Sequence, residues 1–149
     1  MAAVCLDASL VALWFLREEL TPRADALLDQ WRAASVEFIA PPMLMVEVPS
    51  VFRQAVYRGR ITPEEGDVAF AAFLQIGIRV LEPQGLLTRA WDLGKALNTA
   101  RLYDMYYLAL AEMEGCELWT ADRRLANLVA PRSRPVKWIG DALGEPQAD

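Results

Sequence analysis

The architecture follows from one short stretch near the N-terminus, "AVCLDASLVAL" at residues 3–13. Its first four residues are apolar and indicate a buried strand, and the residues after Asp7 have the pattern of a helix. Asp7 is the only charged residue among the first sixteen. Because an aspartate is almost never fully buried without a partner, its position after a buried strand predicts a specific role there.

The rest of the chain repeats this alternation of short apolar runs and longer helical patterns. Strands are predicted at 3–6, 37–40, 78–83, 117–120 and 136–139, and helices at 8–19, 21–34, 43–58, 61–77, 86–97, 101–114 and 123–129. This alternation predicts an α/β fold, a three-layer α/β/α sandwich with a central parallel sheet. We expect one domain over residues 1–141 and a C-terminal tail over 142–149.

Proline and threonine mark several of the predicted helix boundaries. Thr21 is a predicted N-cap, with Pro22 at the first helical position, and Thr62 precedes Pro63 in the same way. Pro49 lies inside the predicted helix at 43–58, where it indicates either a kink or a later helix start.

Composition excludes several classes of function. The chain has no histidine, which excludes a histidine base, histidine metal ligands and a Ser-His-Asp triad. Its net charge of −5 argues against a large non-specific nucleic-acid surface. No apolar stretch is long enough to span a membrane, so we expect a cytoplasmic protein. Cys5 and Cys116 lack metal-site spacing and are expected to be buried free thiols.

Three further acids share the unusual setting of Asp7. Glu47 is the only charge between Phe38 and Phe52, and Asp104 is the only charge between Leu102 and Ala111. Asp122 follows the predicted strand at 117–120, as Asp7 follows the first strand. In parallel sheets ligands bind beyond the carboxyl ends of the strands, so these acids are candidates for one shared site.

Each acid also has a purely structural explanation. Asp122 is a possible cap for the next helix, and Asp7 for backbone N–H groups at its own helix start. Glu47 and Asp104 each have the alternative of pairing with a buried arginine. Together, however, four carboxylates in one cleft would repel one another by about 4 kcal/mol per pair at 4 Å, unless a multivalent cation offsets the repulsion. Oxygen ligands without His or Cys select Mg²⁺ or Mn²⁺, and such a site suits phosphodiester hydrolysis.

Four motifs then point to a family. With "VCLDAS", "PPMLMVEV", "LYDMYYLALAE" and "LWTADRRL" in that order, the chain resembles PIN-domain ribonucleases, in particular VapC-type toxins of type II toxin–antitoxin pairs. The similarity extends from Ala3 to about Asp141. The chain departs from the family pattern at Met105, where an alanine is usual, and at Pro49. The proline lies two residues after Glu47 and bears on the direction of its side chain.

The resemblance implies a Mg²⁺- or Mn²⁺-dependent endoribonuclease that forms a homodimer and is inhibited by a cognate antitoxin. Asp7, Glu47, Asp104 and Asp122 match the acids that serve as metal ligands and catalytic residues in the family. Ser9 and Thr120 match hydroxyl positions that support the acids, although a hydrogen bond to backbone explains them equally well.

The sequence also offers candidates for RNA binding and an alternative function. Arg53, Arg123 and Arg124 are candidates for contacts to RNA phosphates, with a solvated helix face as the simpler explanation. The aromatic residues, Tyr103 among them, have helical spacing that favours core or subunit contacts over base stacking. The alternative function is a non-catalytic α/β module that binds a protein partner in the same acidic cleft.

Overall fold

The computed structural model describes residues 2–129 and 134–141. Along the chain, five strands alternate with seven helices in this described part. The strands are β1 (Ala3–Leu6), β2 (Glu37–Ala40), β3 (Ile78–Val80), β4 (Glu117–Thr120) and β5 (Val136–Trp138). The helices are α1 (Ala8–Leu13), α2 (Thr21–Ala33), α3 (Leu44–Tyr57), α4 (Pro63–Leu74), α5 (Leu86–Leu97), α6 (Tyr103–Glu114) and α7 (Arg123–Val129).

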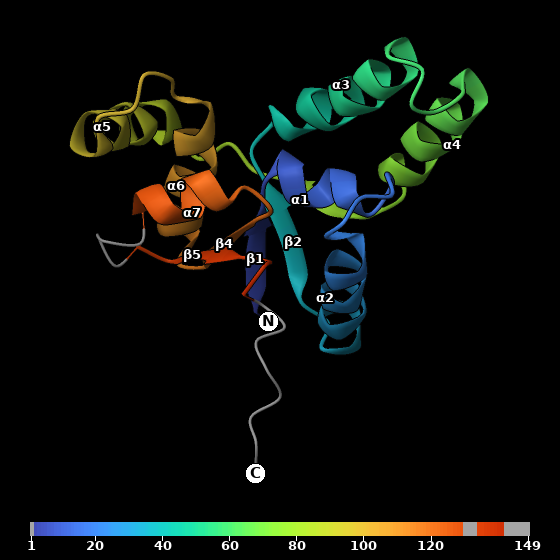
Figure 1. Ribbon diagram of the computed structural model, residues 1–149. Helices are drawn as coiled ribbons and strands as arrows, with labels where there is room; N and C mark the ends of the chain where they lie inside the picture. The colour runs from blue at the N-terminus through green and yellow to red at the C-terminus, as the bar shows by residue number, and fades with distance from the viewer. Residues whose placement is uncertain (1, 130–133, 142–149) are drawn as a thin grey trace.

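The five strands form one parallel sheet in the order β3-β2-β1-β4-β5. The chain runs outward from β1 through β2 to β3, then returns to β4 on the other side of β1 and continues to β5. Figure 1 shows α1 to α4 on one side of the sheet and α5 to α7 on the other. The predicted α/β/α sandwich is therefore confirmed. Because the direction of winding reverses between β1 and β4, their carboxyl ends border the crevice where such sheets bind ligands.

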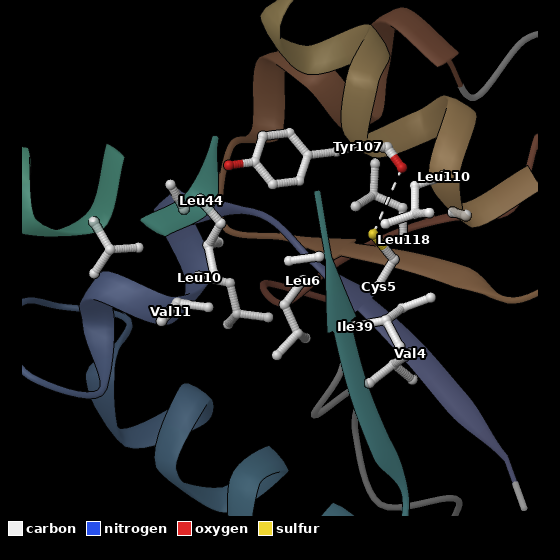
Figure 2. Close-up of a cluster of buried hydrophobic side chains, with 14 of the residues drawn as sticks. Val4, Cys5, Leu6, Leu10, Val11, Ile39, Leu44, Tyr107, Leu110 and Leu118 are labelled. Atoms are coloured by element: carbon white, nitrogen blue, oxygen red, sulfur yellow. Dashed lines mark hydrogen bonds between the residues drawn. The ribbon is translucent and has the colours of Figure 1, made fainter. Parts of the chain in front are cut away.

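Alternating residues of the central strands pack against different helices. Phe38 of β2 and Trp119 of β4 contact Trp31 of α2, with ring centroids 5.9 and 5.3 Å apart. Cys5, one position out of phase, points to α6 and donates to the carbonyl of Tyr107 at 3.5 Å (Figure 2). Both faces of the sheet are thus covered, as its apolar strands require.

Several elements are shorter than predicted, among them α3, α4, α6 and β3, and the first helix differs most. The first helix ends at Leu13 and not at residue 19, because the indole of Trp14 donates to the carbonyl of Ala24 at 2.8 Å and turns the chain toward α2. Thr21 is not an N-cap. Its hydroxyl accepts from the Glu18 N–H and donates to the Leu16 carbonyl, both at 2.9 Å, so it fixes the preceding turn.

The two prolines of the middle region behave differently. Thr62 caps α4, and its hydroxyl and the Glu65 side chain form a reciprocal capping box ahead of Pro63. Pro49 does not delay the start of α3, since the helix already begins at Leu44 and Pro49 lies inside it. The Glu47 backbone is therefore helical, two residues before the proline.

The remaining expectations concern the cysteines, the membrane and the tail. Both cysteines are free thiols, but only Cys5 is fully buried, whereas Cys116 is half-buried. Among the described residues, no helix is long and apolar enough to cross a membrane. The predicted tail at 142–149 lies outside the described residues.

Candidate active site

The carboxylate of Asp7 is buried at the carboxyl end of β1 and ties three segments together. Its Oδ1 accepts from the backbone N–H of Leu10 at 3.1 Å, which caps α1, and from the hydroxyl of Ser9 at 2.7 Å. Its Oδ2 accepts from the hydroxyl of Thr120, the last residue of β4. Asp7 therefore does cap a helix, as its structural explanation predicted, but capping accounts for only one of the three hydrogen bonds that its carboxylate accepts.

The hydroxyls of Ser9 and Thr120 each have one proton, and both protons are directed to Asp7. Each hydroxyl oxygen also accepts a hydrogen bond from a backbone N–H of the segment after β4. The Ala121 N–H donates to Ser9 at 3.1 Å, and the Asp122 N–H donates to Thr120 at 2.9 Å. The two hydroxyl oxygens also lie 3.2 Å from each other, so Asp7, Ser9 and Thr120 form one connected hydrogen-bond group. Because both hydroxyls donate to the carboxylate, the arrangement suits an ionised Asp7.

Asp122 caps the next helix and also faces Arg124. Its Oδ1 accepts from the backbone N–H of Arg124 at 2.9 Å, and its Oδ2 lies 3.1 Å from the Arg124 guanidinium. The same guanidinium nitrogen lies 3.6 Å from Oδ2 of Asp104 in the first turn of α6. Arg124 thus joins two of the four predicted acids. It is not the buried partner considered for Asp104, because its side chain is 80% exposed.

Glu47 of α3 faces the hydroxyl of Tyr107 of α6. Oε1 of Glu47 and the Tyr107 hydroxyl are both buried, and within the described residues neither has a second polar group to bond to. The tyrosine hydroxyl faces the carboxylate, and this contact lowers the pKa of Glu47. Figure 2 shows the Tyr107 ring extending from α6 with its hydroxyl toward Leu44, at the start of α3. No arginine pairs with Glu47 within the described residues.

The four carboxylates form one electrostatic group with Asp104 as the shared member. Burial raises the pKa of Asp7 from 3.8 to about 6, although the bonds from Thr120, Ser9 and Leu10 lower it, and Asp104 raises it further. Burial and then Asp104 raise the pKa of Glu47, with Tyr107 acting against them. Burial and then Asp122 raise the pKa of Asp104, which Arg124 lowers. Asp104 therefore destabilises the ionised forms of Asp7 and Glu47, and Asp122 destabilises that of Asp104.

The carboxylates do not already converge as ligands. Among residues 2–129 and 134–141, no group of three or more His, Cys, Asp or Glu side chains is close enough to hold a metal ion. Two observations nevertheless fit a hard cation. The donors are all carboxylate oxygens that repel one another, and Oε1 of Glu47 is a buried acceptor with nothing to accept from.

Comparison with known proteins identifies the family. The model of the PIN domain matches residues 4–130. The chain is 36% identical over 124 residues to Ribonuclease VapC12 of Mycobacterium tuberculosis, which covers 83% of this chain and 90% of the relative. It is 30% identical over 106 residues to Ribonuclease VapC9 of the same species, covering 68% of this chain and 81% of the relative.

The chain belongs to the PIN-domain family, among the VapC ribonucleases.

Solved structures agree on the fold of this PIN domain. PAE2754 from Pyrobaculum aerophilum superposes with a TM-score of 0.68 at 18% identity, covering 95% of this chain and 93% of that one. VapC20 of Mycobacterium tuberculosis, described as a toxin that cleaves the sarcin-ricin loop, superposes with a TM-score of 0.62 at 16% identity, covering 83% and 93%.

The predicted RNA-binding arginines of the PIN domain have different settings. Arg123 stacks on Trp138, with its guanidinium carbon 5.2 Å from the ring centroid. Arg53 is exposed on α3 and makes no ion pair within the described part of the chain. Arg124 is engaged by Asp104 and Asp122. Only Arg53 is therefore free to meet a phosphate without first leaving another partner.

Sequence reasoning missed the polar role of Tyr107, which it assigned to the core. The side chain is indeed buried, 1% exposed, but its hydroxyl faces Glu47. The available signal was spacing, because Tyr107 follows Asp104 by three residues and so lies on the same helical face.

Because the pKa of Asp7 is raised, the free energy of unfolding of the metal-free protein should depend on pH. Between pH 4 and 6 the folded state retains a proton on Asp7 that the unfolded chain releases. The contribution of Asp7 to the free energy of unfolding is therefore present at low pH and is lost as the pH rises. The loss is on the order of 3 kcal/mol.

Urea unfolding in EDTA at intervals from pH 4 to 8 measures this loss, with Asp7→Asn as the reference that cannot titrate. We expect the wild-type free energy of unfolding to fall relative to Asp7→Asn across this interval. Parallel pH curves for the two proteins would contradict the assignment.

Proposed function

We propose that this chain is a divalent-metal-dependent endoribonuclease that acts as a toxin and is neutralised by a cognate antitoxin. The observation that carries the proposal is geometric: Asp7 is buried at the carboxyl end of β1 and bonded to Thr120 of β4, while Arg124 joins Asp104 to Asp122, in a chain of the PIN-domain family. The names of the relatives, ribonucleases of the VapC type, support the same activity.

Asp7, Glu47, Asp104 and Asp122 would hold one or two Mg²⁺ or Mn²⁺ ions and serve as the catalytic residues. Within residues 2–129 and 134–141, Oδ2 of Asp7 accepts one hydrogen bond, from Thr120, and Oε1 of Glu47 is buried without one. A bound ion of this kind supplies an activated hydroxide at neutral pH and stabilises charge on the leaving oxygen. This chemistry replaces the histidine base that the chain lacks.

Ser9 and Thr120 are supporting residues. By directing their protons to Asp7 they favour its ionised form, against the desolvation that raises its pKa. They also fix the position of the carboxylate relative to β4, because both hydroxyls accept from the backbone after that strand. Asp7 is therefore oriented before any cation arrives.

The expected partners follow from the same proposal. The substrate is RNA, and Arg53, Arg123 and Arg124 are proposed to contact its phosphates. A toxin that cuts cellular RNA would act in the cytoplasm, and we propose a homodimer as its working form. The alternative, a non-catalytic module that binds a protein partner in the acidic cleft, predicts no metal binding by the four acids.

Substitution of Asp104 tests the catalytic role. Asp104→Asn should reduce Mn²⁺-dependent cleavage of single-stranded RNA at least about a hundredfold, since groups around direct metal ligands already contribute roughly 10–100-fold. Asp104 is half-exposed, so the variant should fold, which circular dichroism checks. Asp92→Asn, at an exposed position of α5, is the matched control and should cleave normally. Full activity of Asp104→Asn would contradict the mechanism.

Arg124 is proposed to occupy the place of a cation between Asp104 and Asp122. Solvent screens an exposed ion pair strongly, so a divalent ion can displace the guanidinium readily. Arg124→Gln should therefore tighten Mn²⁺ binding about two- to tenfold, measured by isothermal titration calorimetry. Arg53→Gln, which removes an exposed arginine from α3, should leave the affinity unchanged. Weaker binding by Arg124→Gln would show that the arginine assists the ion and does not compete with it.

A further inference from the structure

A pocket of about 530 Å³ lies directly beside Asp104 and extends away from the four acids. One wall is the turn between α5 and α6 together with the first residues of α6, and the other wall is α7. Asp104 and Arg124 both line it, so it opens onto the proposed catalytic centre. Its volume is within the range of small-ligand sites.

The lining combines an apolar floor, an aromatic side chain and cations. Met105 and Leu125 are buried and contribute apolar surface. Tyr103 is 60% exposed and lines the pocket, so of the core and subunit-contact roles favoured by its helical spacing the core role is wrong. Arg101 is exposed and forms no ion pair within the part of the chain described. The carboxylate of Asp104 also lines the pocket, so a flat apolar group fits this lining with its negative charge at Arg101.

The turn that carries Arg101 is held in place by its own contacts. The hydroxyl of Thr99 donates to the carbonyl of Arg101 at 2.9 Å, and the Thr99 N–H donates to the carbonyl of Gly94 at 2.9 Å. Leu102 packs so closely on Gly94 that a Cβ added there would lie 2.8 Å from its side chain. The wall is thus formed before a ligand binds, which lowers the entropic cost of binding.

We propose that this pocket is a nucleotide subsite that takes one unpaired base of single-stranded RNA next to the bond that is cut. Tyr103 stacks on the base, and Arg101 contacts a phosphate of the same strand. Single-stranded RNA is commonly bound through aromatic side chains on splayed-out bases, whereas a base inside a duplex is not available for stacking. The inference rests on the proposed ribonuclease function and adds to it the part of the protein that positions the substrate.

The test uses a short single-stranded RNA that contains 2-aminopurine, whose fluorescence is quenched when it stacks. Binding is titrated in EDTA, without cleavage, for the wild type, Tyr103→Ala, Tyr103→Phe and Trp91→Ala. Trp91 is the matched control because it is 58% exposed on α5 and lies outside the pocket. We expect Tyr103→Ala to lose the quenching and to bind about 5- to 150-fold more weakly, with Tyr103→Phe and Trp91→Ala close to wild type.

Cleavage assays with Mn²⁺ separate this proposal from the ribonuclease function. Tyr103→Ala should raise KM with little change in kcat, the pattern of a residue that binds substrate without acting on the reacting bond. If the wild type cleaves RNA but Tyr103→Ala matches it in quenching and KM, the subsite is wrong and the ribonuclease function stands. If the quenching pattern is as expected but nothing cleaves, the subsite stands and the ribonuclease function fails. No RNA binding by the wild type, or an equal loss in Trp91→Ala, overturns the subsite.

Discussion

The buried carboxylate of Asp7 connects the fold to the chemistry. It joins β1, α1 and β4 through one backbone N–H and two hydroxyls, at the point where the winding of the sheet reverses. An ionised carboxylate in this position is costly, and its raised pKa expresses that cost. The hydroxyl protons of Ser9 and Thr120 offset part of it, and the negative charge of Asp104 increases it. This imbalance is the physical basis of the proposed cation site.

The other acids differ in how their charge is balanced. Asp104 and Asp122 share an exposed arginine, while Glu47 has an acceptor oxygen without a partner. Among the described residues the acids form no ligand cluster, and the Arg124 guanidinium lies between Asp104 and Asp122. The same arginine lines the pocket beside Asp104, so the proposed metal site and the proposed nucleotide subsite share a residue.

Patterns of apolar residues predicted most of the fold because they report burial directly. The strand at 3–6 and the helix at 86–97 have the predicted bounds, since buried strands and amphipathic helices have clear periodicities. Helix caps were harder to predict, as Thr21 and Thr62 show. Both precede a proline, but only Thr62 is a cap, because the hydroxyl of Thr21 is used in a turn formed by residues 16–18. Such tertiary competition is not visible in local sequence.

Asp7, Glu47 and Asp104 were candidates as lone charges in apolar runs, and Asp122 as an acid after a strand, but their partners were not predictable. Which hydroxyl donates to Asp7, and which arginine lies between Asp104 and Asp122, depends on how segments more than a hundred residues apart, or on different helices, are placed together. Tyr103 and Tyr107 illustrate the same point on one helix. Their sequence setting is alike, yet one is exposed at a pocket and the other is buried against Glu47.

The most direct test of the account is a crystal structure of the wild-type protein grown or soaked with Mn²⁺, examined by anomalous scattering. We expect a manganese peak at the carboxyl ends of β1 and β4, about 2.1 Å from oxygens of Asp7 and Asp104, with the Arg124 guanidinium moved away from Asp104. A structure without manganese at these acids at saturating Mn²⁺, with Arg124 still between Asp104 and Asp122, would contradict it.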